Sequence, residues 1–127
     1  MKGNIVKLII AFSMVTPMTV LANYNAFYYF PGPFDTQTYN PVTKESILEK
    51  TVIYGARNVP QKNVQTLKVL LDINDDQFIE FNDKEIRALV VIDTKIYFID
   101  SNGAVNTAGH TTTFINKHKF TELLSGI

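Results

Sequence analysis

Apolar runs and turn-forming residues alternate most clearly between residues 86 and 107. Residues 86–93 and 96–99 are two runs rich in β-branched and aromatic side chains, the residue types that favour strands. The turn sequence Asp100-Ser101-Asn102-Gly103 follows them, and Gly103 is expected to supply a positive φ there. This stretch therefore predicts a meander of paired strands that forms the central sheet.

Helical periodicity is clearest over residues 61–71. Pro60 is well suited to a first helical turn, and Val64, Leu67, Leu70 and Leu71 recur at steps of three and four residues. Such spacing places apolar side chains along one face of a helix. The sequence therefore predicts an amphipathic helix that packs on the sheet.

Weaker patterns predict the remaining elements. Residues 44–50 are expected to form a helical turn and residues 51–54 a strand, with further strands at 26–30 and 111–115. Asn116 is a plausible N-cap for a short closing helix that ends near Gly126. The domain is therefore expected to begin with a helical turn and to end with a C-terminal helix.

Together these elements predict a small single α+β domain over residues 42–127. We expect an antiparallel meander of about four to five strands, one main helix packed on it and a short C-terminal helix, with the helices on one face of the sheet. The length of 127 residues, 46% of them hydrophobic and 19% charged, is typical of one globular domain.

Residues 1–22 differ in pattern from the rest of the chain. Lys2 and Lys7 precede an apolar run over residues 8–15, and small residues precede the expected cut. These are the features of a cleaved secretory signal peptide. A membrane anchor would need roughly 20 continuous apolar residues, whereas polar residues and Pro17 interrupt this run. We therefore expect a protein of the bacterial periplasm or exterior, with no stable membrane anchor after cleavage.

The charge of residues 23–127 limits the classes of partner. This segment holds all 12 acidic residues but only 10 of the 12 basic ones, so its net charge is −2. A weakly acidic chain has no electrostatic basis for binding nucleic acid or an anionic membrane. The chain also has no cysteine, which excludes disulfides and the lipid-modified cysteine of a bacterial lipoprotein.

Residues 23–41 form an N-terminal arm that is unusually aromatic. It holds 7 of the 15 aromatic residues within 16 positions, and Pro31-Gly32-Pro33 ends the strand expected at residues 26–30. Three interpretations stay open: the arm folds over the core, presents a binding surface or is disordered. The candidate binding residues are Tyr24, Phe27, Tyr28, Tyr29, Phe30, Phe34 and Tyr39, together with Asp75 and Asp76.

The acidic loop at residues 72–83 is the strongest candidate for a metal site. Its oxygen-bearing residues at calcium-loop positions are Asp72, Asn74, Asp76 and Asp83. Alternating oxygen ligands of this kind partly resemble an EF-hand loop. However, Gln77 stands where the sharp turn needs glycine, and no helix follows the loop. We therefore favour a solvated loop and assign no metal and no cofactor.

Catalytic residues are harder to identify. Asp93 and Asp100 flank a predicted hairpin and could divide acid and base roles if it brought them together, although aspartates there commonly form turns. His110 lies in a turn and His118 in the closing helix, without a third ligand at zinc-site spacing. No nucleotide or nucleophile motif is found.

The sequence therefore favours a small exported binding protein. Its most concrete form is an inhibitor or immunity-type protein that blocks another protein through a surface rather than by catalysis. This hypothesis rests on the size of the chain and its predicted export, and no motif supports it. One alternative is a cell-envelope hydrolase that uses Asp93, Asp100 or His110. Another is a cation-binding or structural module that uses the acidic loop. A homodimer formed through an edge strand at 26–30 or 111–115 is a further hypothesis.

Overall fold

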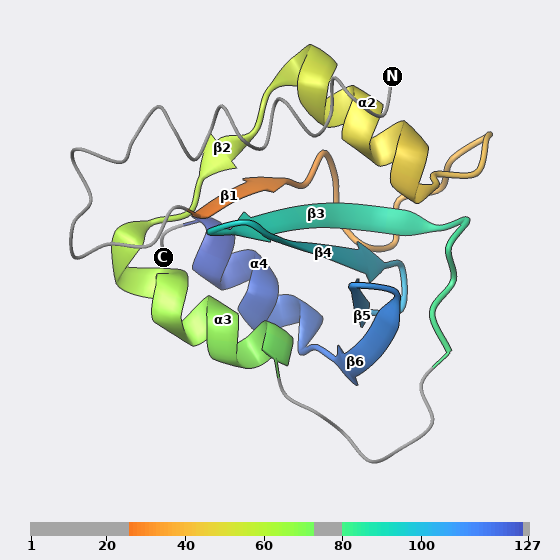
Figure 1. Cartoon of the computed structure of the whole chain (residues 1–127). Coiled ribbons are helices and arrows are strands. Elements are labelled where there is room, and N and C mark those ends of the chain that lie inside the picture. The colour runs from red at the N-terminus through yellow and green to blue at the C-terminus, as the bar shows by residue number, and fades with distance from the viewer. Residues whose placement is uncertain (1–25, 73–79, 126–127) are drawn as a thin grey trace.

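The computed structural model describes residues 26–72 and 80–125. In chain order its elements are β1 (Ala26–Tyr29), α2 (Lys44–Tyr54), β2 (Arg57–Asn58), the short 3₁₀ helix η1 (Gln61–Asn63), α3 (Val64–Asp72), β3 (Ile86–Ile92), β4 (Lys95–Asp100), β5 (Ala104–Thr107), β6 (His110–Phe114) and α4 (Lys117–Ser125). The strands form one antiparallel sheet in the order β2-β1-β3-β4-β5-β6 (Figure 1). The predicted α+β class is confirmed, with six strands instead of four to five.

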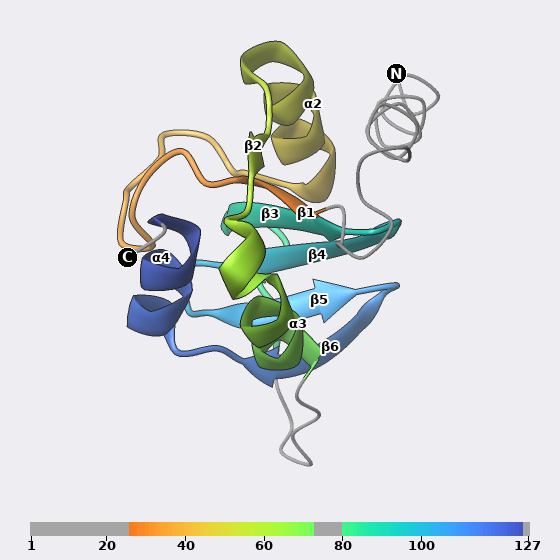
Figure 2. The ribbon, with the colours of Figure 1, turned by 90° about the vertical axis from the view of Figure 1, so that its left-hand side faces the viewer.

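The helices cover both faces of the sheet, and the expectation that they share one face is wrong. α2 lies on one side of β3, while α3 and α4 lie on the other (Figure 2). Every residue of β3 is buried, as expected for a strand covered on both faces. The continuous apolar run in β3 was the sequence signal for this arrangement.

Two hydrophobic clusters result from this layering. On the side of α3 and α4, the buried members include Leu67, Leu71, Val90, Tyr97, Ile99, Val105 and Phe120. On the side of α2 they are Val42, Ile47, Ile86, Leu89, Val91 and Phe98. Alternate residues of β3 and β4 thus contribute to opposite clusters, as the two-residue period of a strand requires.

A β-bulge interrupts this alternation at Arg87. Ile86 pairs with Asp100 and Ala88 pairs with Ile99, so Arg87 is an extra residue between two consecutive pairs. In a regular strand, residues two positions apart such as Ile86 and Ala88 would point to the same face. The bulge instead places Ile86 in the cluster beneath α2 and Ala88 in the opposite cluster.

α2 continues to Tyr54, so the strand predicted for residues 51–54 is wrong. The hydroxyl of Thr51 donates a hydrogen bond to the carbonyl of Ile47 (2.7 Å), and the helix ends at Gly55, whose φ is 86°. The misleading residues were Val52, Ile53 and Tyr54, which favour strands by type but are exposed on the helix. The preference of these residues for strands depends on burial against a sheet, and here they are exposed.

The predicted helix over residues 61–71 is confirmed as η1 followed by α3. The Asn116 cap is also confirmed, because its Oδ1 accepts a hydrogen bond from the backbone N–H of Lys119 (3.0 Å). Gly103 has the expected positive φ of 91°. The expected end near Gly126 lies outside the described residues.

β1 lies inside the sheet, so it is not the edge strand that was predicted. It pairs with β3 on one side and with the two-residue β2 on the other. The two edges of the sheet are β2 and β6, and β6 corresponds to the strand predicted over residues 111–115. Within the described residues, no helix has the length and apolar content needed to cross a membrane.

Candidate binding groove

The first turn of α2 is held firmly against the start of β3. The backbone N–H of Ser46 donates to the hydroxyl of Thr43 (3.2 Å), and the N–H of Thr43 donates to the hydroxyl of Ser46 (2.8 Å), which is a capping box. Just before it, Val42 donates to the carbonyl of Lys84 (2.8 Å) and accepts from Ile86 (2.9 Å). These bonds fix the position from which Lys44 leaves the helix.

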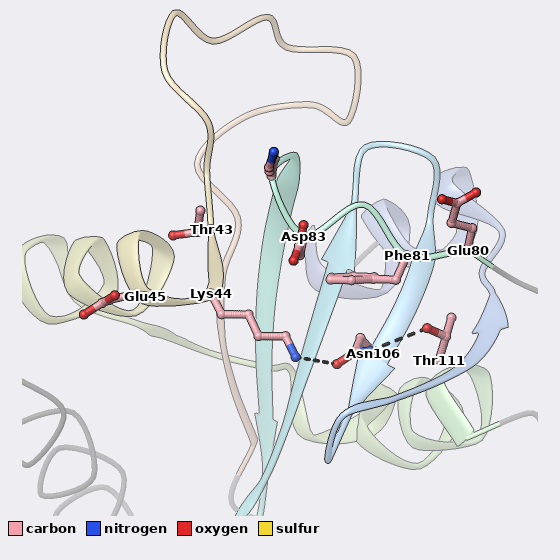
Figure 3. A pocket seen from close by; sticks show the side chains of 9 residues that line it. Thr43, Lys44, Glu45, Glu80, Phe81, Asp83, Asn106 and Thr111 are labelled. Carbon is pink, nitrogen blue, oxygen red and sulfur yellow. Dashed lines mark hydrogen bonds between the residues drawn. The ribbon is translucent and has the colours of Figure 1, made fainter.

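Lys44 extends across the open part of the sheet (Figure 3). Its Nζ donates a hydrogen bond to Oδ1 of Asn106 on β5 (2.7 Å) and lies 5.3 Å from the ring centroid of Phe98 and 5.8 Å from that of Phe81. Both distances are within the range of cation–π attraction. Lys44 forms no ion pair with a carboxylate of the described residues.

A groove of about 680 Å³ lies beside Lys44 (Figure 3). Its lining residues come from the start of α2, the segment before β3, and strands β5 and β6; they are Thr43, Lys44, Glu45, Glu80, Phe81, Asp83, Lys84, Asn106 and Thr111. A second groove of about 730 Å³ is lined by Glu80, Phe81, Asn82, Asp83, Lys84, Asn102 and Phe114. We call them the paired grooves, because Phe81 and three of its neighbours line both.

The charges of the paired grooves are unevenly distributed. Lys44 is directed toward Asn106, whereas Glu45 points away from it (Figure 3). Glu80 precedes Phe81 and Asp83 follows two positions after it, and neither forms an ion pair with a described residue. Lys84 also lines both grooves. Phe81 is half-buried, and Phe114 is 47% exposed at the edge strand. The grooves thus combine aromatic surface with free carboxylates.

Most of the candidate aromatic residues are used in packing. Phe34 is buried, and its ring centroid lies 5.0 Å from that of Phe30 and 5.6 Å from that of Phe120 on α4. Phe27, Tyr28 and Tyr29 are half-buried on β1. Tyr39 is fully exposed, and Tyr24 lies outside the described residues. The structure brings Tyr28, Tyr29 and Phe30 together at one pocket of about 470 Å³, but Phe27, Phe34 and Tyr39 do not line it.

The acidic loop is described only at its ends. Asn74, Asp75 and Asp76 lie outside the described residues. Asp72 at the end of α3 accepts hydrogen bonds from the hydroxyl of Tyr97 (2.7 Å) and from Nζ of Lys95 (3.1 Å), while Asp83 lines the paired grooves. Residues 26–72 and 80–125 contain no group of three His, Asp or Glu side chains suited to a metal.

The structure separates the residues of the predicted acid pair. Asp93 follows β3 at the hairpin turn, whereas Asp100 ends β4 at the opposite end of the strand, on the order of 20 Å away by the rise of a strand. Asp100 is fully buried and accepts three backbone N–H groups, from Asn82 (2.8 Å), Asn102 (2.9 Å) and Ala104 (2.9 Å). Its carboxylate stabilises the turn.

The two histidines are also apart from any shared site. His110 is exposed at the start of β6. His118 is exposed on α4, and its Nε2 lies 2.9 Å from the carboxylate of Glu122. Neither is within the paired grooves.

Sequence reasoning missed Lys44, Phe81 and Asn106. The first and last are separated by 62 positions and meet only because α2 docks on β3 and the meander folds back beside it. No local sequence pattern predicts the contact between Lys44 and Asn106. The one available signal was Phe81 itself, an aromatic residue next to Glu80 and two positions before Asp83. Comparisons with protein-family models, curated proteins and solved structures found no match to this chain.

Proposed function

We propose that this chain is an exported inhibitor or immunity-type protein whose paired grooves hold a segment of another protein. The observation that carries the proposal is the arrangement around Phe81. This aromatic side chain lies between two open grooves, with Glu80 and Asp83 free of ion pairs within the described residues. An aromatic anchor next to free carboxylates fits a basic, partly apolar segment.

The position of the grooves supports a macromolecular partner. They lie on the part of the sheet that α2 leaves open, next to the edge strand β6 and the exposed Phe114. Each groove is large enough to accept side chains from a partner's loop, since small-molecule pockets span about 300–1,000 Å³. Binding at this face would block a partner by covering its surface and would require no chemistry.

The export half of the proposal rests on residues 1–22, which lie outside the described residues. It is tested separately by expressing the full chain in a bacterium, separating periplasm from cytoplasm and sequencing the N-terminus. We expect a product that begins at Asn23 in the periplasm or medium. A cytoplasmic product that retains Met1 would overturn this half alone.

The binding half is tested by affinity capture from a periplasmic extract with the purified protein as bait. We compare it with the double variant Glu80→Lys/Asp83→Lys and with Phe81→Ala. Because the grooves supply acidic and aromatic contacts, both variants should lose the captured protein. Capture by the unaltered protein should also weaken as salt rises.

A matched control is the double variant Asp35→Lys/Glu122→Lys, which makes the same change in net charge at exposed carboxylates outside the grooves. It should retain the partner. Equal capture by all variants would place binding elsewhere and contradict the proposal, as would the absence of any partner under mild washing. Self-association that the Phe81→Ala change abolishes would identify a second copy of the chain as the occupant.

A further inference from the structure

Arg87 is a charged residue in an unusually buried position. It is the bulge residue of β3 and only 8% of its surface is exposed. Buried arginines are normally paired with a carboxylate, because removing an unpaired charge from water is costly. Here its Nε donates to the carbonyl of Thr36 (3.1 Å) and its Nη1 donates to the carbonyl of Ile86 (3.2 Å). No carboxylate of the described residues forms an ion pair with it.

The guanidinium has donors left over. It carries five N–H groups, and the bonds to Thr36 and Ile86 use one on Nε and one on Nη1. No side-chain nitrogen or oxygen in the described residues is fully enclosed without a hydrogen-bond partner. Arg87 also lines two pockets, so part of its guanidinium borders open space. The free donors of Arg87 therefore face a space that another molecule can enter.

That space includes a small pocket of about 210 Å³ beneath α2. Its lining is mostly apolar and comes from the loop after β1, from α2 and from β3; the residues are Tyr29, Pro31, Gly32, Thr36, Thr38, Val42, Ile47, Lys50, Ile86 and Arg87. Two of them, Lys50 and Arg87, are cationic, and none is acidic. The pocket shares no residue with the paired grooves.

A wider pocket of about 440 Å³, which shares Thr36 and Thr38 with the first, also reaches Arg87, and there Asp35 and Glu85 supply negative charge that offsets Arg87 and Lys117. Glu85 is already engaged, because its carboxylate accepts a hydrogen bond from the hydroxyl of Ser101 (2.8 Å). The smaller pocket has two cations and no carboxylate, whereas the wider one has two of each, so an anion should prefer the side that holds Lys50. The apolar lining on that side favours an anion with a small apolar body.

We propose that the pocket between α2 and the loop after β1 binds the carboxylate of a small apolar acid. Arg87 donates from its free N–H groups, Lys50 adds a second positive charge at the rim, and Val42 and Ile47 contact the apolar part. A planar guanidinium matches a carboxylate in geometry as well as in charge. A free organic acid and the C-terminal residue of a peptide share this chemistry, and the two are separated by experiment.

The test follows side-chain and backbone NMR signals of the purified ¹⁵N-labelled protein during titration. The probes are benzoate with its neutral counterpart benzamide, and N-acetyl-glycyl-leucine with its C-terminal amide. The chain has two arginines, so the Nε–H signal of the exposed Arg57 is an internal control. We expect at least one acid to shift the Arg87 signal and the Ile86 amide, while both amides leave them unchanged.

Variants then separate binding from a purely structural role of Arg87. Lys50→Glu changes an exposed rim residue and should weaken the acid about fivefold, whereas Lys62→Glu, an exposed lysine outside the pocket, should not. Arg87→Gln should weaken it more than about tenfold if it folds. If it does not fold, the Lys50 and amide comparisons still decide.

Each outcome has a defined meaning. Binding of benzoate alone identifies a free acid as the ligand class, and binding of the peptide alone identifies a C-terminal residue. Shifts of equal size with acid and amide would overturn the proposal, because the charge would then play no part. The absence of any shift at Arg87 with both acids would overturn it too. None of these outcomes bears on the paired grooves, which are tested by other residues.

Discussion

The hydroxyl of Tyr97 links the central sheet to the end of α3. Tyr97 is fully buried and donates a hydrogen bond to Asp72 (2.7 Å). Burial raises the pKa of Tyr97 far above its usual value of 10.0, and the hydrogen bond to Asp72 and the charge of that carboxylate raise it further. A single side chain thereby makes the stability of the fold depend on pH.

We predict that the free energy of unfolding falls as pH rises through about 10. Below this pH both states hold the tyrosine proton. Above it the unfolded chain loses the proton while folded Tyr97 keeps it, so unfolding becomes more favourable. Urea unfolding between about pH 8 and 11 measures the slope. The Tyr97→Phe variant should have a smaller slope, and an identical slope would contradict this account.

Asp100 provides a second prediction for a single residue. Its carboxylate accepts the three backbone N–H groups of Asn82, Asn102 and Ala104 inside the protein. Asp100→Asn replaces one acceptor oxygen by an NH₂ group that faces a donor, so we expect a loss of about 2 kcal/mol in unfolding free energy. Denaturant unfolding is the measurement. Asp35→Asn, at an exposed carboxylate, should change stability by less than about 0.5 kcal/mol.

At the scale of elements, the sequence was most informative where burial is one-sided. The α3 pattern and the turn before β5 were predicted well, because periodicity and Gly103 are local signals. α2 was misread since it buries only Ile47 and Thr51 and exposes apolar residues at its end. The bulge at Arg87 was not predicted, because a polar residue within an apolar run does not reveal which neighbours change faces.

Glycines at the turns of the meander test the link between backbone conformation and packing. Gly103 has a φ of 91°, and an added Cβ would lie 3.2 Å from the carbonyl oxygen of Ile115. Gly109 has a φ of 79° and open space around it. The positive φ should lower the unfolding free energy of both alanine variants by roughly 1–2 kcal/mol. Only Gly103→Ala also crowds its neighbours. Thermal unfolding should therefore show that this variant loses about 1 kcal/mol more stability than Gly109→Ala.

For the whole molecule, the decisive fact is that β3 belongs to both hydrophobic clusters. Ala88, Val90 and Ile92 contribute to one, and Leu89 and Val91 to the other. Neither cluster can therefore lose its packing without exposing the central strand. The molecule should unfold as one cooperative unit despite having two cores.

This cooperativity is testable with one substitution in each core. Ile47 and Leu67 are fully buried on opposite faces of the sheet. Ile47→Ala and Leu67→Ala should each cost about 2–5 kcal/mol. In the double variant the costs should add within about 0.5 kcal/mol, because the two sites share no contact. Urea unfolding followed by circular dichroism and by tyrosine fluorescence should give coincident transitions, and separate transitions would refute a single unit.

The candidate groove also forms only in the whole folded molecule, so no local sequence pattern predicted it. Lys44, Phe81 and Asn106 come from three segments that meet only in the folded molecule. The predicted aromatic residues were recognised as unusual, but Phe30 and Phe34 pack against the core and α4. Composition alone does not distinguish an aromatic residue that packs from one that binds.

The pairing of β1 with β3 also sets a time course for the nascent chain. Tyr29 pairs with Leu89, so the aromatic strand β1 is synthesised 60 residues ahead of its partner. At roughly 5–20 residues per second, translation leaves a delay of about 3–12 seconds. During this interval β1 is an unpaired strand with aromatic side chains, and such strands are prone to aggregate. A chaperone that shields residues 26–29 until β3 emerges would raise the yield of folded protein.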